Sequence, residues 1–180
     1  MRAIAAFAAW ALIVSLSTAA RVLKVGVLLS QPRTDPVHVQ QQMINDDPSL
    51  LPGVTLELVV NYTDNDRFTA LRMARWQAET QQVRAIVGPE WSAVAKVVSP
   101  YLGGMHIPHI SPSATASSLS SAADYKYFSR VVPPDTLQGS ALFQLVQSFN
   151  WTKVAILQSS DDYGRNGLNI FVRKCHEKQI

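Results

Sequence analysis

The chain is poor in the residue types that build most metal centres and disulfide frameworks. Its 180 residues include one cysteine and four histidines. A single cysteine excludes any disulfide within the chain, and the histidines lack the spacing of a standard zinc site, so we expect no metal. Cys175 is either a buried small apolar side chain or half of a bridge to a cysteine outside this sequence. We favour the bridge, because the sequence stops shortly after it.

Motifs for several common activities are also absent. The sequence has no Walker loop, no G-x-G-x-x-G and no G-x-S-x-G nucleophile motif. Charged residues make up only 16%, the net charge is +3, and the basic residues are dispersed rather than gathered into a stripe. That pattern argues against nucleic acid as a partner. We therefore expect neither an enzyme active site nor a cofactor.

The N-terminus carries the clearest targeting pattern. A basic residue precedes an apolar run at residues 3–16, and residues 17–20 supply a small-residue cleavage zone. The run is shorter than the roughly 20 residues that a membrane-spanning helix needs. We interpret residues 1–20 as a signal peptide, with a signal anchor as the alternative. In the secretory pathway Asn61 and Asn150, which begin N-x-T sequons, would be candidate glycosylation sites.

Beyond residue 20, short apolar segments alternate with amphipathic ones. This alternation predicts an α/β fold with an open, mostly parallel sheet flanked by helices. In the helix expected at residues 67–82, Phe68, Leu71, Met73, Ala74 and Ala78 are predicted to form the apolar side, with Met73 and Trp76 as packing residues. Strands are expected at residues 22–29, 54–60, 85–87, 107–110, 128–132 and 152–157, and helices at 37–44, 67–82, 92–102, 136–149 and from 165 onward.

Two loops at the expected carboxyl edge of this sheet have unusual chemistry. After the strand at 85–87, residues 88–92 (GPEWS) open a helix whose first backbone N–H groups have no partner inside the helix. Those groups and the helix dipole suit a carboxylate or phosphate. After the next strand, residues 111–115 (SPSAT) offer hydroxyls, and ligands of open α/β sheets bind at this edge. We predict one pocket; alternatively, Ser92 is only an N-cap and the second loop a solvated turn.

Several blocks of the sequence, in order, resemble the extracellular ligand-binding region of class C G protein-coupled receptors, most nearly the metabotropic glutamate receptors. They include AIVGPEWSAVAKVVSPYL, IPHISPSATASSLS, YKYFSRVVPPDTLQGSALFQLVQSFNWTKVAIL and DDYGRNG. The resemblance implies the Venus flytrap, or type I periplasmic-binding-protein, fold. It places residues 21–149 in a partial lobe 1 and residues 150–180 at the start of lobe 2.

The resemblance also implies a ligand site that agrees with the chemistry of the two loops. A helix N-terminus and hydroxyls would hold the α-carboxylate of an amino acid, and a carboxylate and an aromatic ring its ammonium group. N-capping explains Asp135 equally well. Arg33, in a breaker-rich loop, is a poor candidate for binding a distal carboxylate, so side-chain selectivity is open. The implied carboxylate positions are Ser92, Ser113 and Thr115, with Ala114 in the same loop, and the implied ammonium positions are Thr115, Asp135 and Tyr163.

The function implied by the resemblance is that of a cell-surface receptor. A small ligand, such as an amino acid, would bind between two extracellular lobes and favour their closed state. A receptor dimer, and coupling to a G protein through a transmembrane region beyond residue 180, are implied as well. The alternatives are the ectodomain of a receptor guanylyl cyclase and a soluble amino-acid-binding protein that serves a transporter.

Overall fold

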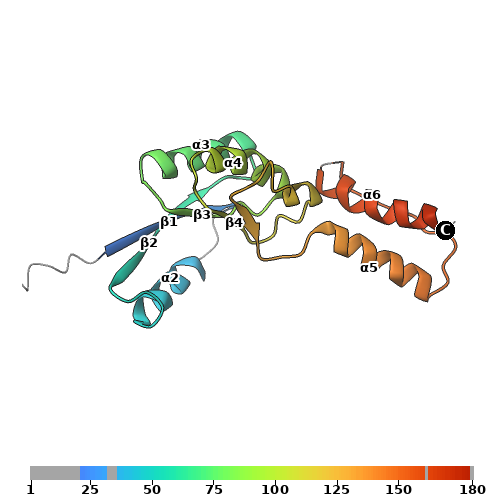
Figure 1. Ribbon diagram of the computed structural model, residues 1–180, viewed down its shortest axis with the longest axis horizontal. Coiled ribbons are helices and arrows are strands. Elements are labelled where there is room, and N and C mark those ends of the chain that lie inside the picture. Colours follow the sequence, from blue (N-terminus) through green and yellow to red (C-terminus); the bar gives the residue numbers. More distant parts are fainter. Residues whose placement is uncertain (1–20, 32–35, 161, 179–180) are drawn as a thin grey trace, which may run out of the picture.

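The computed structural model describes residues 21–31, 36–160 and 162–178. The predicted signal peptide and Arg33 lie outside these ranges. In Figure 1 a sheet is covered by helices α3 and α4 on one face and by α2 on the other, while α5 and α6 lie together at one end. The arrangement confirms the predicted α/β fold class.

All strands of the described sheet are parallel. The inner strand β1 has a neighbour on each edge, which fits its nearly continuous apolar sequence. The strand predicted at 107–110 forms only as a three-residue strand, because its first two residues lead out of the preceding helix. The strands are β1 (Arg21–Leu29), β2 (Val54–Tyr62), β3 (Ala85–Val87), β4 (His109–Ser111) and β5 (Phe128–Arg130), in the order β2-β1-β3-β4-β5.

The helices follow the predicted order with shifted ends. The second of them, α3 (Arg67–Glu79), begins after Asp66, whose side chain accepts a hydrogen bond from the Thr69 N–H at 2.7 Å. It ends earlier than predicted, and Gln82 just beyond it has a left-handed φ of 55°. The helices are α2 (Pro36–Asp46), α3 (Arg67–Glu79), α4 (Ser92–Gly104), α5 (Asp135–Ser148) and α6 (Asp162–Glu177), with a 3-10 turn η1 at Ser117–Ser120.

The main core lies between the sheet and the α3–α4 layer. Alanines 70, 74 and 78, spaced four residues apart, form the buried face of α3, so the helix backbone approaches the sheet closely. Phe68 is 82% exposed and Trp76 41% exposed, because both lie off that alanine face. Their predicted core packing was therefore wrong, whereas Met73 does pack against the core.

One polar side chain was not anticipated in this core. The amide of Gln77 is fully buried and donates to the Val27 carbonyl (3.2 Å), the Val59 carbonyl (2.7 Å) and Asn61 Oδ1 (2.9 Å). It therefore joins α3 to both β1 and β2. Gly26 makes room for it, since a Cβ at that position would lie 2.2 Å from Gln77 Oε1.

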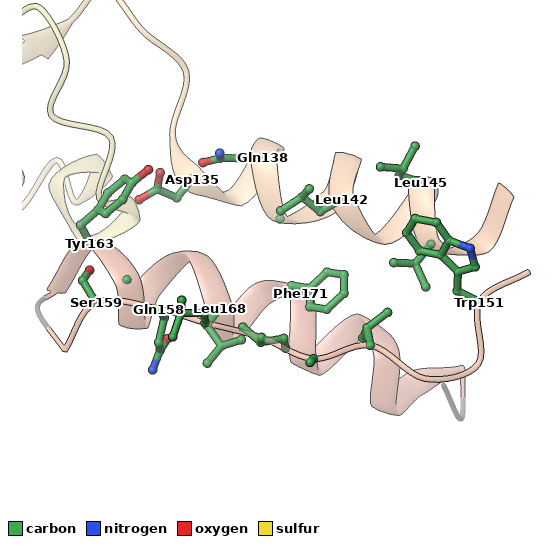
Figure 2. A pocket seen from close by; sticks show the side chains of 17 residues that line it. Asp135, Gln138, Leu142, Leu145, Trp151, Gln158, Ser159, Tyr163, Leu168 and Phe171 are labelled. Carbon is green, nitrogen blue, oxygen red and sulfur yellow. The ribbon is translucent and has the colours of Figure 1, made fainter. Parts of the chain in front are cut away.

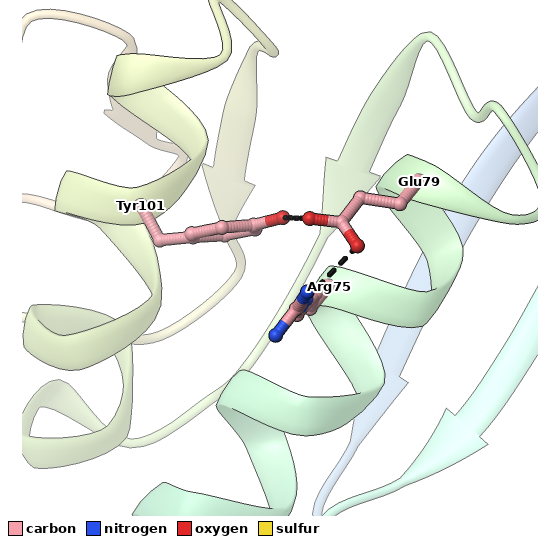
Figure 3. A network of polar contacts seen from close by, with 3 residues as sticks. All are labelled: Arg75, Glu79 and Tyr101. Atoms are coloured by element: carbon pink, nitrogen blue, oxygen red, sulfur yellow. Dashed lines mark hydrogen bonds and ion pairs between the residues drawn. The ribbon is translucent and has the colours of Figure 1, made fainter.

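At the surface, α3 and α4 are joined by the polar group shown in Figure 3. Glu79 accepts a hydrogen bond from Arg75 Nε at 2.9 Å and another from the Tyr101 hydroxyl at 3.0 Å. These bonds, the one from Arg75 first, lower the pKa of Glu79. Because the group is exposed to solvent, we expect it to help fix the relative orientation of the two helices while adding little to the free energy of unfolding.

The strand predicted at residues 152–157 is not formed. The segment has no regular secondary structure and is exposed, and the Leu157 side chain is 102% exposed. Its sequence has strong β-propensity, but a strand needs a neighbour to pair with, and none of the described strands pairs with it.

Cys175 is a free, buried thiol packed with Phe143, Val146 and Phe171, which matches the small-apolar interpretation among the described residues.

A buried histidine connects β4 to the turn after β3. His109 Nε2 bonds to the Gly88 carbonyl at 2.7 Å, and Nδ1 to the Ser99 hydroxyl at 2.5 Å. The carbonyl can only accept, so Nε2 carries the proton and Nδ1 accepts from Ser99. Burial lowers the pKa of His109 to about 4, partly opposed by the bond to Gly88. The ring is therefore neutral at physiological pH.

We predict that Gly26→Ala destabilises the fold. The new methyl group would displace the Gln77 amide from its backbone acceptors, at a cost of about 1–3 kcal/mol of unfolding free energy. Denaturant unfolding measures the effect. In a Gln77→Ala background the same substitution should cost clearly less, and Gly103→Ala, where a Cβ meets nothing within 4 Å, should cost nothing. Equal losses in both backgrounds would contradict the steric explanation.

We also predict that acid destabilises the fold through His109. Between its folded pKa of about 4 and its ordinary unfolded value of 6.5, only the unfolded chain binds the proton. Stability should therefore fall as the pH drops from 6.5 to 4, by up to about 3 kcal/mol from this residue. Urea unfolding across this range tests it. His109→Gln should flatten the slope, and the exposed-residue control His176→Gln should leave it unchanged.

Candidate functional site

The loops after β3 and β4 meet at the carboxyl edge of the sheet and are hydrogen-bonded to each other. Parallel neighbours in the sheet bring these strand ends together (Figure 1). Each bond pairs a serine hydroxyl of one loop with a backbone group of the other, so the loops form one unit. The Ser111 hydroxyl donates to the Pro89 carbonyl (2.7 Å), the Ser113 hydroxyl donates to the Glu90 carbonyl (3.0 Å), and the Ala116 N–H donates to Ser92 Oγ (3.1 Å).

Ser92 does not act as the N-cap of α4. The helix begins at Ser92 itself, and Trp91 occupies the capping position without a side-chain capping bond. The Ser92 side chain is only 6% exposed and accepts from Ala116 instead. The N-cap interpretation was therefore wrong: Ser92 holds the second loop against the first turn of α4.

Asp135 also differs from a simple capping residue. It is the first residue of α5, Pro134 occupies the N-cap position, and no side-chain capping bond forms. Asp135 is 1% exposed, and neither carboxylate oxygen has a hydrogen-bond partner in the described part of the chain. A buried carboxylate without a partner is costly and is uncommon outside functional sites.

Thr115 lies next to Asp135 in the folded chain, and the two are joined by a backbone hydrogen bond. Its carbonyl accepts the Asp135 N–H at 2.9 Å, while its own hydroxyl is buried and has no partner in the described ranges. Two neighbouring residues thus present unsatisfied polar atoms. Ala114, between the two loop hydroxyls, is fully buried and lines neither of the cavities described below.

Arg130 holds this loop in place and was not anticipated. From β5 its guanidinium donates to the carbonyls of Ala114 (3.2 Å) and Ala116 (2.9 Å), and it also bonds the Ser120 hydroxyl. Burial lowers the pKa of Arg130, and the charge of Asp135 opposes that shift. An arginine within the short strand expected at residues 128–132 (FSRVV) was the available sequence signal.

Two cavities open at this edge. The first, of about 310 Å³, brings together four of the predicted ligand residues. The second, of about 470 Å³, runs between α5 and α6 and is lined by Asp135 at one end and by apolar side chains along its length (Figure 2). Tyr163 lines both cavities, and its ring extends toward Asp135 in Figure 2. The first cavity is lined by Glu90, Trp91, Ser92, Ala93, Ser113, Thr115 and Tyr163.

The remaining predicted features can also be located. Asn150 is exposed just after α5, while Asn61 is half-buried and its Oδ1 accepts from Gln77. Within the described ranges no group of three His, Cys, Asp or Glu residues could hold a metal ion. None of the helices in those ranges combines the length and the hydropathy of a membrane span.

Comparison with known proteins shows which family the chain is similar to. The family described as "Receptor family ligand binding region" matches residues 40–180. Metabotropic glutamate receptor 6 of Mus musculus is 34% identical over 161 residues, which are 74% of this chain and 18% of the receptor. The metabotropic glutamate receptor of Drosophila melanogaster is 28% identical over 163 residues, 76% of this chain and 17% of that protein.

A third relative, metabotropic glutamate receptor-like protein E of Dictyostelium discoideum, is 36% identical over 101 residues, 56% of this chain and 12% of its own length. The chain thus spans less than a fifth of each of these relatives. Most of the chain, including both loops and the candidate site, lies within the family match. The chain belongs to the family of receptor ligand-binding regions and is related to those of the metabotropic glutamate receptors.

Proposed function

We propose that the chain is part of the extracellular ligand-binding region of a class C G protein-coupled receptor that senses an α-amino acid. The observation that carries the proposal is the buried Asp135 carboxylate, without a hydrogen-bond partner in the described residues and lining a cavity with Tyr163. A ligand ammonium would supply the missing partner. The metabotropic glutamate receptors among the relatives support a receptor rather than an enzyme.

The other end of the ligand would bind in the adjoining cavity. The first turn of α4 faces it through Ser92 and Ala93, and backbone N–H groups of a helix N-terminus favour a carboxylate. The unpaired Thr115 hydroxyl can donate to the same carboxylate. Ser113 lines this cavity too, although its hydroxyl already donates to Glu90.

Signalling would require parts beyond this chain. We propose that a second lobe closes over the ligand and that closure shifts the receptor between two conformations. A dimer and a G protein would then be the partners, with the binding region outside the cell. Passage through the secretory pathway would permit a glycan on exposed Asn150, and on Asn61 before Gln77 packs against it.

We predict that Asp135→Asn and Thr115→Ala weaken amino-acid binding. Removing the carboxylate should cost about 30-fold or more in affinity and removing the hydroxyl about 10-fold, since charged hydrogen bonds are the stronger. Calorimetry on the protein expressed from its complete coding sequence measures both. Because Asp135 is buried and unpaired, Asp135→Asn should not lower the melting temperature of the ligand-free protein.

The control for this experiment is Asp46→Asn, which removes an exposed carboxylate at the end of α2. It should change neither affinity nor stability. Unchanged affinity in both Asp135→Asn and Thr115→Ala would contradict the proposed site. A large loss of melting temperature in Asp135→Asn would instead assign Asp135 a structural role.

We predict that the ring of Tyr163, more than its hydroxyl, supports ligand binding. A ring face attracts an ammonium group, so Tyr163→Phe should retain most of the affinity while Tyr163→Ala should lose about 5- to 30-fold. The comparison uses the same titration. Equal losses in the two variants would show that the hydroxyl, and not the ring, makes the contact.

A further inference from the structure

Glu90 forms one wall of the smaller cavity and is held in place at both ends. Its Oε2 accepts the Ser30 N–H at 3.1 Å, and its backbone carbonyl accepts the Ser113 hydroxyl at 3.0 Å. The side chain is half-buried and lines the cavity beside Trp91, which is 52% exposed. The carboxylate is therefore anchored at the site rather than free in solvent.

Strand order places the anchor of this carboxylate on the opposite side of β3 from Thr115 and Asp135. Ser30 directly follows β1, which lies on one side of β3, whereas β4 and β5 lie on the other side. Thr115 follows β4 and Asp135 follows β5. A ligand held by Asp135, Thr115 and the first turn of α4 can extend its side chain past β3 toward the β1 side, where the Glu90 carboxylate lies.

The charged side chains that line the two cavities in the described part of the chain are both acidic. No Lys, Arg or His is among the described residues that line either cavity, whereas Glu90 lines one and Asp135 the other. Asp135 is an unpaired carboxylate more than nine-tenths buried, which independently indicates a bound cation. An acidic ligand side chain would meet Glu90 without a compensating cation, whereas a basic side chain would gain a charged partner.

We propose that Glu90 and Trp91 form a side-chain subsite for a cationic group, so that the site prefers a basic α-amino acid to an acidic one. The inference rests on the proposed amino-acid site and adds its selectivity. Glu90 supplies the counter-charge, and the exposed Trp91 ring offers a face on which a guanidinium or ammonium group can lie. The anchoring bond from Ser30 orients the carboxylate before the ligand arrives.

The test is titration of the protein, expressed from its complete coding sequence, with L-arginine, L-glutamine and L-glutamate. We expect L-arginine to bind most tightly and L-glutamate most weakly. Glu90→Gln keeps an amide oxygen for the Ser30 N–H and removes only the charge, so it should reduce the preference for L-arginine over L-glutamine about tenfold. Glu57→Gln, which removes an exposed carboxylate on β2, should leave that preference unchanged.

The possible results distinguish the Glu90–Trp91 subsite from the amino-acid site as a whole. Tightest binding of L-glutamate or L-glutamine, in a manner sensitive to Asp135→Asn, would overturn the inference and leave the amino-acid site standing. A preference for L-glutamate that is lost in Arg33→Ala would also overturn the cationic subsite and leave the amino-acid site standing. Binding of none of the three amino acids would overturn both. An arginine preference that Glu90→Gln does not alter would overturn the role of Glu90.

Discussion

The candidate site depends on the serine hydroxyls that join the loops after β3 and β4. Ser92, Ser111 and Ser113 each bond to a backbone group of the opposite loop. Two short loops without mutual bonds would be the least ordered part of such an edge. Joined to each other, they keep the first turn of α4 and the Thr115 hydroxyl on one cavity.

Buried groups behind the loops support the same arrangement. His109 holds the Gly88 carbonyl from the core side, and Arg130 holds the carbonyls of Ala114 and Ala116 from β5. The bonds to Gly88 and Ala114 satisfy carbonyls in the interior, while the Ala116 carbonyl also accepts the Leu119 N–H. The oxygens of Thr115 and Asp135 are among the buried side-chain atoms that find no partner in the described residues. The free-energy cost of burying these unpaired oxygens is offset by stabilising interactions elsewhere in the fold, as is usual at a binding site.

The prediction of the core shows how far local patterns reach. Apolar periodicity placed α3 and its buried Ala74 and Ala78 correctly, but it also assigned the exposed Phe68 to the apolar side and did not include Ala70. Whether Phe68 or an alanine faces the sheet depends on how closely the two backbones approach, and that distance is not encoded in the periodicity of one helix. The buried role of Gln77 was not predicted either, because the backbone carbonyls that accept its hydrogen bonds lie on β1 and β2 and not on α3. The segment at 152–157 shows the opposite error, because strong β-propensity does not make a strand without a partner.

The sequence by itself determined the parallel α/β architecture, the order of its elements and the convergence of two polar loops, because strand–helix alternation and breaker residues are local signals. The tertiary structure alone decided the individual roles. Ser92 joins loops rather than capping α4, Asp135 is buried without a partner rather than capping α5, and Glu90 turns a carboxylate toward the β1 side of the cavity. Ser92 and Glu90 each act through a contact with a residue at least 24 positions away, and Asp135 is set apart by its burial. None of these features is visible in the sequence until the strands pair.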